Sequence, residues 1–436
     1  MPPGFGTPSP PVAEGVGLPW DVPVDPNVGA VAAIADARAR YGDTFVVDSG
    51  DDHYLFTFSA TGVESFYALP EELASKGVAD YLMLRRKLPD EIFAGRRVLP
   101  TSLFRRDDVA CYLANLHWAL AETVTELGSR GSVDLFDLTR RLGHRMGLAS
   151  WAGPGSAEGD AFERLVAAFD VLDGSDAFVH PDAMAKVAAS GKRAERSALE
   201  TVVAVVENAV HLVDSAAVPD AALFGRIVEA WSAQPPESGS DRIRGIGLDV
   251  ALIHIASMSN LMAALGWAMV DLLEHPTELD AVAGGDDDLA RRCALESTRL
   301  AQRSIMSRAV LAPVDLDTGE QTYRVPAGWT IATLLPLLNT SAAPGLERWE
   351  PDRWHRHRLA DTAGLASPML VTAFGHGKHT CPAQSFSLAA MTSAMTRLFG
   401  QYRMTPRWTS YPRPVPEQIG GVARAADRCP VDYAQR

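Results

Sequence analysis

A glycine-rich loop holds the residues whose types and spacing most clearly indicate chemistry. It reads FGHGKHTCPAQ over residues 374–384, and an apolar helical pattern, SFSLAAMTSAMTRLF, follows it directly. Loop glycines let the backbone approach a flat ligand closely. A cysteine beside a helix N-terminus favours the thiolate, the form of the side chain that binds metals. The pattern therefore predicts that Cys381 is a metal ligand, with a buried cysteine in a turn as the plain alternative.

The loop resembles the heme-binding signature of the cytochrome P450 family, Phe-x-x-Gly-x-His-x-Cys-x-Gly. Phe374, Gly377, His379 and Cys381 match this signature, whereas Ala383 stands where the family usually has glycine. The resemblance implies heme b (iron protoporphyrin IX) as the cofactor, with Cys381 as the axial thiolate ligand of the iron. Such a thiolate donates electron density to the iron and favours O–O cleavage.

The same resemblance implies further contacts with the cofactor. Arg308 lies at the strand position that pairs with a heme propionate, and His379 lies at a second such position. Phe374, Gly375 and Ala256 are the other residues that we expect to contact the heme.

One frequent propionate contact of the family is missing. The family carries Trp-x-x-x-Arg on an early helix, but here Trp118 is followed at that spacing by Glu122. Arg106 is the residue that we expect to substitute for this arginine.

A second motif lies upstream of the loop. Glu296 and Arg299 are three residues apart, which places a carboxylate and a guanidinium on one face of a helix. Alone, such a pair is usually a solvated surface pair. It matches the family's Glu-x-x-Arg, however, and Arg353 in the sequence PDRW would be its third member. The resemblance thus implies a buried ion network with a structural role.

The run from 245 to 275 is apolar nearly all round and long enough to cross a membrane. His254, Ser257, Ser259 and Asn260 interrupt its middle. These features favour a helix that crosses the centre of a soluble protein.

Ser259 and Asn260 occupy the positions where most oxygen-activating members of the family carry an acid and a threonine that relay protons. We expect them to be the catalytic side chains. In having an asparagine at this position, the chain is similar to prostacyclin synthase, an isomerase that needs no O2. It is also similar to the bile-acid sterol hydroxylases, which are monooxygenases. Its amide can hydrogen-bond an oxygen atom but cannot ionise. Alternatively, Asn260 is bonded only to helix backbone or water.

The resemblance favours a monooxygenase that oxidises a medium-sized organic molecule, in bacterial secondary metabolism. It would use O2 and electrons from a ferredoxin and a ferredoxin reductase, and Lys378 beside the loop suits an acidic ferredoxin. Residues 60–110 and 160–225, the roof of the pocket by resemblance, are mostly apolar. A peroxide-dependent peroxygenase, or an O2-independent isomerase or dehydratase, is the alternative.

Other elements follow from local patterns. Residues 44–58 read as a small sheet with a hairpin turn at 49–52, and residues 107–276 read as almost all helix. Short strands return after Arg308 in RAVLAPVDL, QTYRV and WTIATLL. We expect a mainly α fold with a minor β region, the triangular prism of the family, in a single domain over 1–436 with a proline-rich lead at 1–30.

Composition limits the function classes. Hydrophobic residues make up 47% of the chain and charged residues 22%, which predicts a large core. A net charge of −14 argues against a nucleic-acid partner. The four cysteines have no CxxC spacing, which argues against a zinc knuckle or a disulfide framework. The first 30 residues lack a signal-peptide pattern. We expect a cytoplasmic monomer without a membrane anchor.

Overall fold

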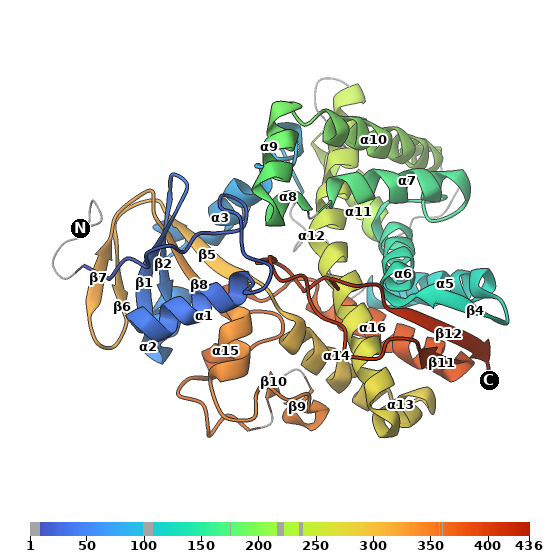
Figure 1. Cartoon of the computed structure of the whole chain (residues 1–436). Helices are drawn as coiled ribbons and strands as arrows, with labels where there is room; N and C mark the ends of the chain where they lie inside the picture. Colours follow the sequence, from blue (N-terminus) through green and yellow to red (C-terminus); the bar gives the residue numbers. More distant parts are fainter. Residues whose placement is uncertain are drawn as a thin grey trace.

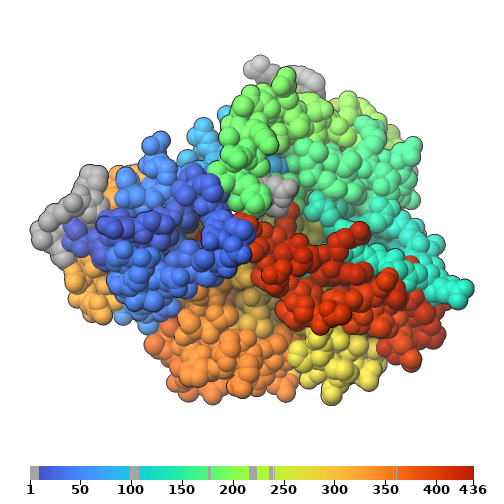
Figure 2. Space-filling model, in the orientation of Figure 1, coloured from blue at the N-terminus to red at the C-terminus, as the bar shows by residue number. Residues whose placement is uncertain are grey.

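The computed structural model describes residues 9–98, 108–174, 176–215, 222–234, 239–356, 358–359 and 361–436. Helices dominate, and most strands gather on one side of a long helix, α12 (Gly239–Glu274), that runs through the middle (Figure 1). In Figure 2 the C-terminal segment, in red, crosses the front of the molecule between the N-terminal part in blue and the helices in green. The predicted mainly α fold with a minor β region is confirmed.

The other helices are α1 (Ala30–Tyr41), α2 (Ala60–Ala68), α3 (Lys76–Leu84), α5 (Val109–Leu127), α6 (Leu135–Trp151), α7 (Gly159–Leu172), α8 (Asp176–Val179), α9 (Pro181–Ala189), α10 (Arg193–Asp214), α11 (Ala222–Ala233), α13 (Pro276–Ala283), α14 (Asp287–Ala301), α15 (Leu335–Ser341) and α16 (Gln384–Gln401). The 3-10 turns are η1 (Asp90–Ile92), η3 (Pro351–Arg353), η4 (Pro368–Leu370) and η5 (Gly377–His379). The strands are β1 (Thr44–Ser49), β2 (Asp52–Thr57), β3 (Ala74–Ser75), β4 (Arg130–Asp134), β5 (Ile305–Val310), β6 (Val314–Asp317), β7 (Thr322–Val325), β8 (Thr330–Leu334), β9 (Trp354–His355), β10 (Arg358–Leu359), β11 (Tyr402–Pro406) and β12 (Pro430–Gln435).

The largest sheet has the strand order β1-β2-β8-β5-β3. Its β1–β2 hairpin, paired from Thr44↔Thr57 to Ser49↔Asp52, confirms the predicted turn. Strand β8 joins β2 in parallel, and β5 joins β8 antiparallel, so that the strands predicted after Arg308 are present. Alternate residues of β1 enter different cores: Phe45 and Val47 pack on one face of the sheet and Val46 on the other.

The helical middle holds one element that the sequence pattern missed. Strand β4 follows α5 directly, within the residues 107–276 that were predicted to be almost all helix. It pairs antiparallel with β12, which also pairs with β11, in a three-stranded sheet. The partner strand lies some three hundred positions along the chain, which explains why a local pattern could not reveal it.

Helix α12 begins at Gly239, earlier than the predicted 245, and ends at Glu274. It has the length and hydropathy of a membrane span, but 67% of the relevant window is buried by other parts of the chain. Its polar residue His254 is buried and lies 2.9 Å from His144 of α6, measured between Nε2 and Nδ1. In this fold α12 is therefore a core helix, as its interrupted pattern predicted.

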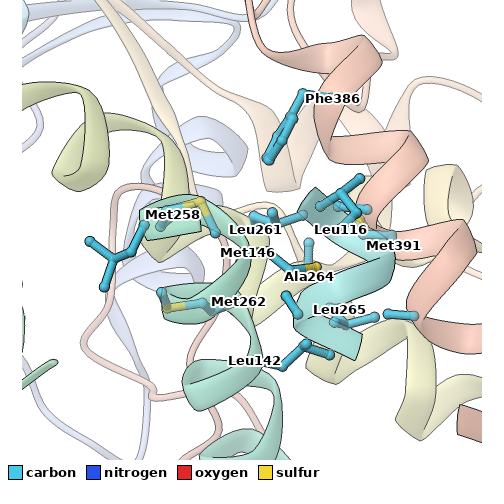
Figure 3. Close-up of a cluster of buried hydrophobic side chains, with 14 of the residues drawn as sticks. Leu116, Leu142, Met146, Met258, Leu261, Met262, Ala264, Leu265, Phe386 and Met391 are labelled. Carbon is cyan, nitrogen blue, oxygen red and sulfur yellow. The ribbon is translucent and has the colours of Figure 1, made fainter. Parts of the chain in front are cut away.

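Close packing of α6 on α12 holds the central helix in place. A Cβ atom on Gly143 would come within 2.4 Å of Met262, and one on Gly147 within 2.9 Å of Met258. Figure 3 shows both methionines in a cluster with leucine and methionine side chains from α5, α6 and α16. The two glycines allow the helix backbones to approach, so the residues of α12 have a rigid support.

Candidate functional site

The loop before α16 presents Cys381 by means of glycine geometry. The Cys381 N–H donates to the carbonyl oxygen of Phe374 at 2.7 Å. Gly375 has φ +81°, and a Cβ atom there would lie 2.4 Å from the carbonyl oxygen of His379. Only glycine fits this position. Phe374 is half-buried against the main core and fixes the start of the loop.

The Cys381 side chain is half-buried, and this burial raises the pKa of its thiol. A hydrogen bond from the Ala383 N–H opposes the shift but does not cancel it. The sequence pattern predicted a thiolate from the nearby helix end, but α16 begins only at Gln384, and loss of hydration outweighs its effect. Without a bound cation this thiol is therefore a poor nucleophile, whereas a metal ion would ionise it on binding. Ala383 has φ −92°, an ordinary value that alanine adopts easily.

The structure brings together the two side chains assigned to heme propionates. Arg308 Nη1 lies 2.7 Å from His379 Nε2. Arg308 also donates to three backbone carbonyl oxygens of the segment 66–74 and, at 3.1 Å, to Glu71. These contacts occupy all the N–H groups of a guanidinium. An incoming carboxylate would therefore have to replace one of them, and Glu71, which is half-exposed, is the most accessible partner.

Two polar atoms next to this pair are buried without a hydrogen-bond partner among the described residues. They are the Tyr67 hydroxyl and His376 Nε2. The two rings meet edge to face with centroids 5.4 Å apart, and the Tyr67 ring lies 5.9 Å from that of His379. An unsatisfied buried polar group costs about 1 to 3 kcal/mol. This surplus of hydrogen-bonding groups beside Arg308 fits a ligand that brings carboxylates, as heme does.

The middle of α12 carries an open stripe on an otherwise buried helix. Ala256 and Asn260 are exposed and Leu252 is half-buried, at a spacing of four residues that places them on one face. Asn260 Oδ1 accepts the backbone N–H of Val422 at 2.8 Å. Because that donor must face the amide oxygen, the Nδ2 group points elsewhere, and in the described chain it has no hydrogen-bond partner. Asn260 is thus bonded to backbone, but to a distant segment, and it offers N–H donors to a ligand.

Ser259 has charged neighbours that the sequence did not suggest. Its Oγ lies 3.5 Å from Arg424 Nη2, and the same nitrogen donates to Asp173 Oδ2 at 3.2 Å. Asp173 and Arg424 are 251 positions apart, so no spacing could have linked them. The carboxylate of Asp173 therefore lies near Ser259, which occupies the helix position where most oxygen-activating members of the family carry an acid.

The predicted ion network is present and buried. Glu296 and Arg299 have fully buried side chains, with Oε1 and Nη2 2.7 Å apart. Arg353 Nε lies 3.2 Å from the same oxygen. Trp354 Nε1 donates to Oε2 at 2.9 Å, and the Glu350 N–H donates to Oε1 at 3.0 Å. Glu296 thus has partners for both oxygens, as a structural role requires.

Arg106, the substitute expected for the missing arginine, lies outside the described residues. Trp118 is 36% exposed on α5, which gives no support to a cofactor contact at that tryptophan.

No protein-family model matches the chain. Curated relatives do match it. Human 24-hydroxycholesterol 7-alpha-hydroxylase is 27% identical over 213 residues, which cover 42% of this chain and 43% of that protein. Cytochrome P450 165B3 of Amycolatopsis orientalis is 23% identical over 186 residues, 42% of this chain and 41% of that protein. The matched segments thus span less than half of each relative.

The fold has a solved counterpart over nearly the whole chain. The crystal structure of CYP175A1 from Thermus thermophilus aligns with a TM-score of 0.62 at 19% identity. The alignment covers 93% of this chain and 94% of that protein. At this identity the likeness establishes the fold.

Proposed function

We propose that this chain, a cytochrome P450 by fold and by sequence similarity, is a heme-thiolate monooxygenase that oxidises a medium-sized organic molecule. The observation that carries the proposal is the loop that presents Cys381, because its geometry depends on Gly375 and because polar atoms of Tyr67 and His376, unpartnered in the described part of the chain, lie next to Arg308 and His379, where they fit the carboxylates of a heme. Heme is the cofactor that the relatives and the fold indicate.

The chain supplies a distinct group for each part of this chemistry. When bound, a heme with a cysteine thiolate ligand supplies the O–O cleavage that oxidation of an unactivated C–H bond requires. Cys381 would ligate the iron, and the group around Arg308, His379, Tyr67 and His376 would bind the propionates. Asn260 would donate from Nδ2 to an oxygen of a substrate or ligand, because its Oδ1 is held by Val422.

The substrate proposal rests on the open stripe of α12. Leu252 and Ala256 are apolar, and Asn260 is its one amide. A site with an apolar wall and few polar groups takes a largely apolar molecule with one or two polar substituents. We place it among secondary metabolites, and the name of the human relative states a sterol substrate.

The redox partner would be a ferredoxin supplied by a ferredoxin reductase. Lys378, in the Cys381 loop, is exposed, and so is Arg356 in the segment after η3. Arg356 lines a pocket between α14 and α16 next to Gln384, the first residue of α16. Asp287 and Asp288 line it as well, and Arg291 there is paired with Asp288. Cations this close to the ligand loop suit an acidic protein that approaches to deliver electrons.

The alternative is an O2-independent isomerase or dehydratase, or a peroxygenase. One observation favours it: α12 carries Ser259 and Asn260 where a proton relay would need an acid. Anaerobic turnover decides between the two. A panel of sterols and terpenoids is screened for a shift in the heme spectrum, and the best binder is then incubated with and without O2, ferredoxin, reductase and NADPH. Incorporation of labelled oxygen from O2 supports the monooxygenase, whereas product formed anaerobically without reductant refutes it.

The ligand assignment has its own test. Ferrous protein treated with carbon monoxide should show the strongly red-shifted absorbance of a thiolate-ligated heme, and Cys381→Ser should abolish it. Cys111→Ser, on α5, changes a free cysteine outside the loop and should leave the spectrum unchanged. Retention of the red-shifted band in Cys381→Ser would show that another group binds the iron.

A further inference from the structure

A charged pocket of about 300 Å³ connects Ser259 with the molecular surface. Its outer wall includes Asp137 and Arg428, whose side chains are 71% and 82% exposed. Deeper in, the side chains of Arg424 and Asp173 are 30% and 16% exposed, and Ser259 is half-buried. The pocket has room for several water molecules and is lined with groups that bind them.

The least exposed charged side chains of this pocket next to Ser259 form an ion pair, Arg424 with Asp173. Arg424 Nη2 donates to both the carbonyl oxygen of Asp173, at 3.1 Å, and its Oδ2, at 3.2 Å. The same nitrogen lies 3.5 Å from Ser259 Oγ. Arg140 Nη1 is a second cation, 3.8 Å from Asp173 Oδ2. The backbone of Arg424 is held as well, because its N–H donates to Gln418 Oε1 at 2.8 Å.

Asp173 is the carboxylate best placed to serve Ser259. Asp134 is already committed, because it caps α6 and accepts the Cys429 N–H. Asp137 and Asp427, whose side chains are 71% and 64% exposed, lie at the mouth of the pocket. Asp173 alone is linked to Ser259 through a single shared partner.

We propose that this pocket is the route by which protons reach the side of α12 that carries Asn260, and that Asp173 is its acid. The inference rests on the proposed monooxygenase function, which consumes protons. The carboxylate of Asp173 takes a proton from solvent and releases it to water in the pocket. Ser259 Oγ accepts a proton from that water and passes its own to water or a ligand on the Asn260 side of α12, and the same steps in reverse carry a proton out to solvent. Each oxygen therefore gains one proton and loses one.

Arg424 is a positioning residue in this route. A guanidinium does not deprotonate in proteins, so it cannot carry the proton itself. It holds the carboxylate of Asp173 and the hydroxyl of Ser259 at fixed places around one nitrogen. The acid that is missing from α12 is thus supplied by the residue that follows α7, through an arginine of the C-terminal segment.

Cyanide binding to the ferric heme protein tests the route without substrate or O2. Hydrogen cyanide must lose a proton to bind as the anion, whereas carbon monoxide binds ferrous heme without proton transfer. In Asp173→Asn we expect cyanide association to slow by about a hundredfold, the lower end for general acid–base effects, with no change in carbon monoxide association. Ser259→Ala should shift the same two rates in the same way.

The matched control is Asp214→Asn. Like Asp173, Asp214 forms an ion pair with an arginine. Its partner is Arg242 of α12, with the two charged atoms 2.8 Å apart, but Asp214 does not line this pocket. Both association rates should stay at the wild-type value in this variant. Unchanged cyanide association in Asp173→Asn and Ser259→Ala would overturn the proposal. An equal fall in both rates would also overturn it, because it would indicate altered access rather than proton transfer. Neither result bears on the O2 test, so the two proposals fail separately.

Discussion

The Glu296 network on α14 and the Ser259 group on α12, which consists of Ser259, Arg424 and Asp173, each join charged residues to a helix, but they differ in burial. Glu296 and Arg299 have fully buried side chains and hydrogen bonds on every side. Arg424 is 30% exposed and borders a pocket that opens to solvent. A closed, satisfied network can only hold the fold together, whereas an open one can exchange hydrogen bonds and protons with water. The first follows the family pattern and the second departs from it.

Removal of Arg299 should have the largest effect. Arg299→Ala leaves the buried Glu296 carboxylate with fewer counter-charges, and we expect a loss of about 3 to 5 kcal/mol in the free energy of unfolding. Denaturant unfolding of the heme protein measures it. Arg292→Ala, on the same helix but in partly exposed ion pairs with Asp288 and Asp352, should cost less than about 1 kcal/mol. Equal losses in the two variants would contradict the assignment of Arg299 to a structural network.

A smaller loss is expected from the edge of the same network. Trp354→Phe removes one hydrogen bond to the Glu296 carboxylate and keeps most of the buried ring, so we expect about 1.5 to 3 kcal/mol. Trp408→Phe is the matched control, because Trp408 Nε1 donates to Glu274 at an exposed site. If both variants unfold at the same denaturant concentration, burial does not strengthen the Trp354 bond.

Acid should lower the free energy of unfolding by a smaller amount through His144 of α6 and His254 of α12. Burial lowers the pKa of His144 and of His254, so both stay neutral in the folded protein. Below about pH 6.5 the unfolded chain binds protons that the folded protein does not, so their contribution is complete above that pH and is lost as the pH falls. Asp249 and Asp271 act in the opposite direction, because burial raises the pKa of each to about 6.

The contribution of the two histidines is therefore measured by comparing the wild type with a variant that lacks them. The free energy of unfolding is followed from pH 7.5 to pH 5 in the wild type and in the double variant His144→Leu, His254→Leu. The variant should lose stability less steeply with acid. Superimposable curves would show that the histidine pair does not resist protonation.

The smallest effect on stability is expected at Asn260. Asn260→Ala removes one hydrogen bond to the backbone N–H of Val422 at an exposed helix residue, so the cost should be about 1 kcal/mol. The same variant should weaken the binding of ligands that accept a hydrogen bond from Nδ2, measured by spectral titration of the heme. A loss of stability as large as that of Arg299→Ala would show that Asn260 has a structural role instead of a role in ligand binding.

Local and motif-based features of the sequence predicted much of the structure. The hairpin at 44–57 follows from alternating strand residues around Gly50, and α12 follows from one long apolar run. The Glu296 network was recognisable because two of its members are three residues apart on one helix. These features depend on neighbours in the chain or on a shared motif.

The rest depends on contacts that only the folded chain creates. The Asp173–Arg424 pair joins the residue after α7 to the C-terminal segment, and neither residue lies in a recognisable pattern. Arg308 was predicted to bind a propionate, but nothing in the sequence revealed that Glu71 and the carbonyls of 66–74 would surround it. The raised pKa of the Cys381 thiol depends on burial, which a helix-end argument does not include.

Strand β4 has a consequence for how the protein is made. Its partner β12 pairs Asp134 with Pro430 and Arg130 with Ala434, and Asp134 also binds the Cys429 N–H. At about 5 to 20 residues per second, a ribosome needs roughly 15 to 60 s to synthesise the intervening chain. During that time β4 is an unpaired edge, and α5 and α6 lack the strand that joins them to the end of the chain. Nascent chains should therefore be prone to aggregation at high expression rates, and slower synthesis at low temperature or the presence of a chaperone should raise the soluble yield.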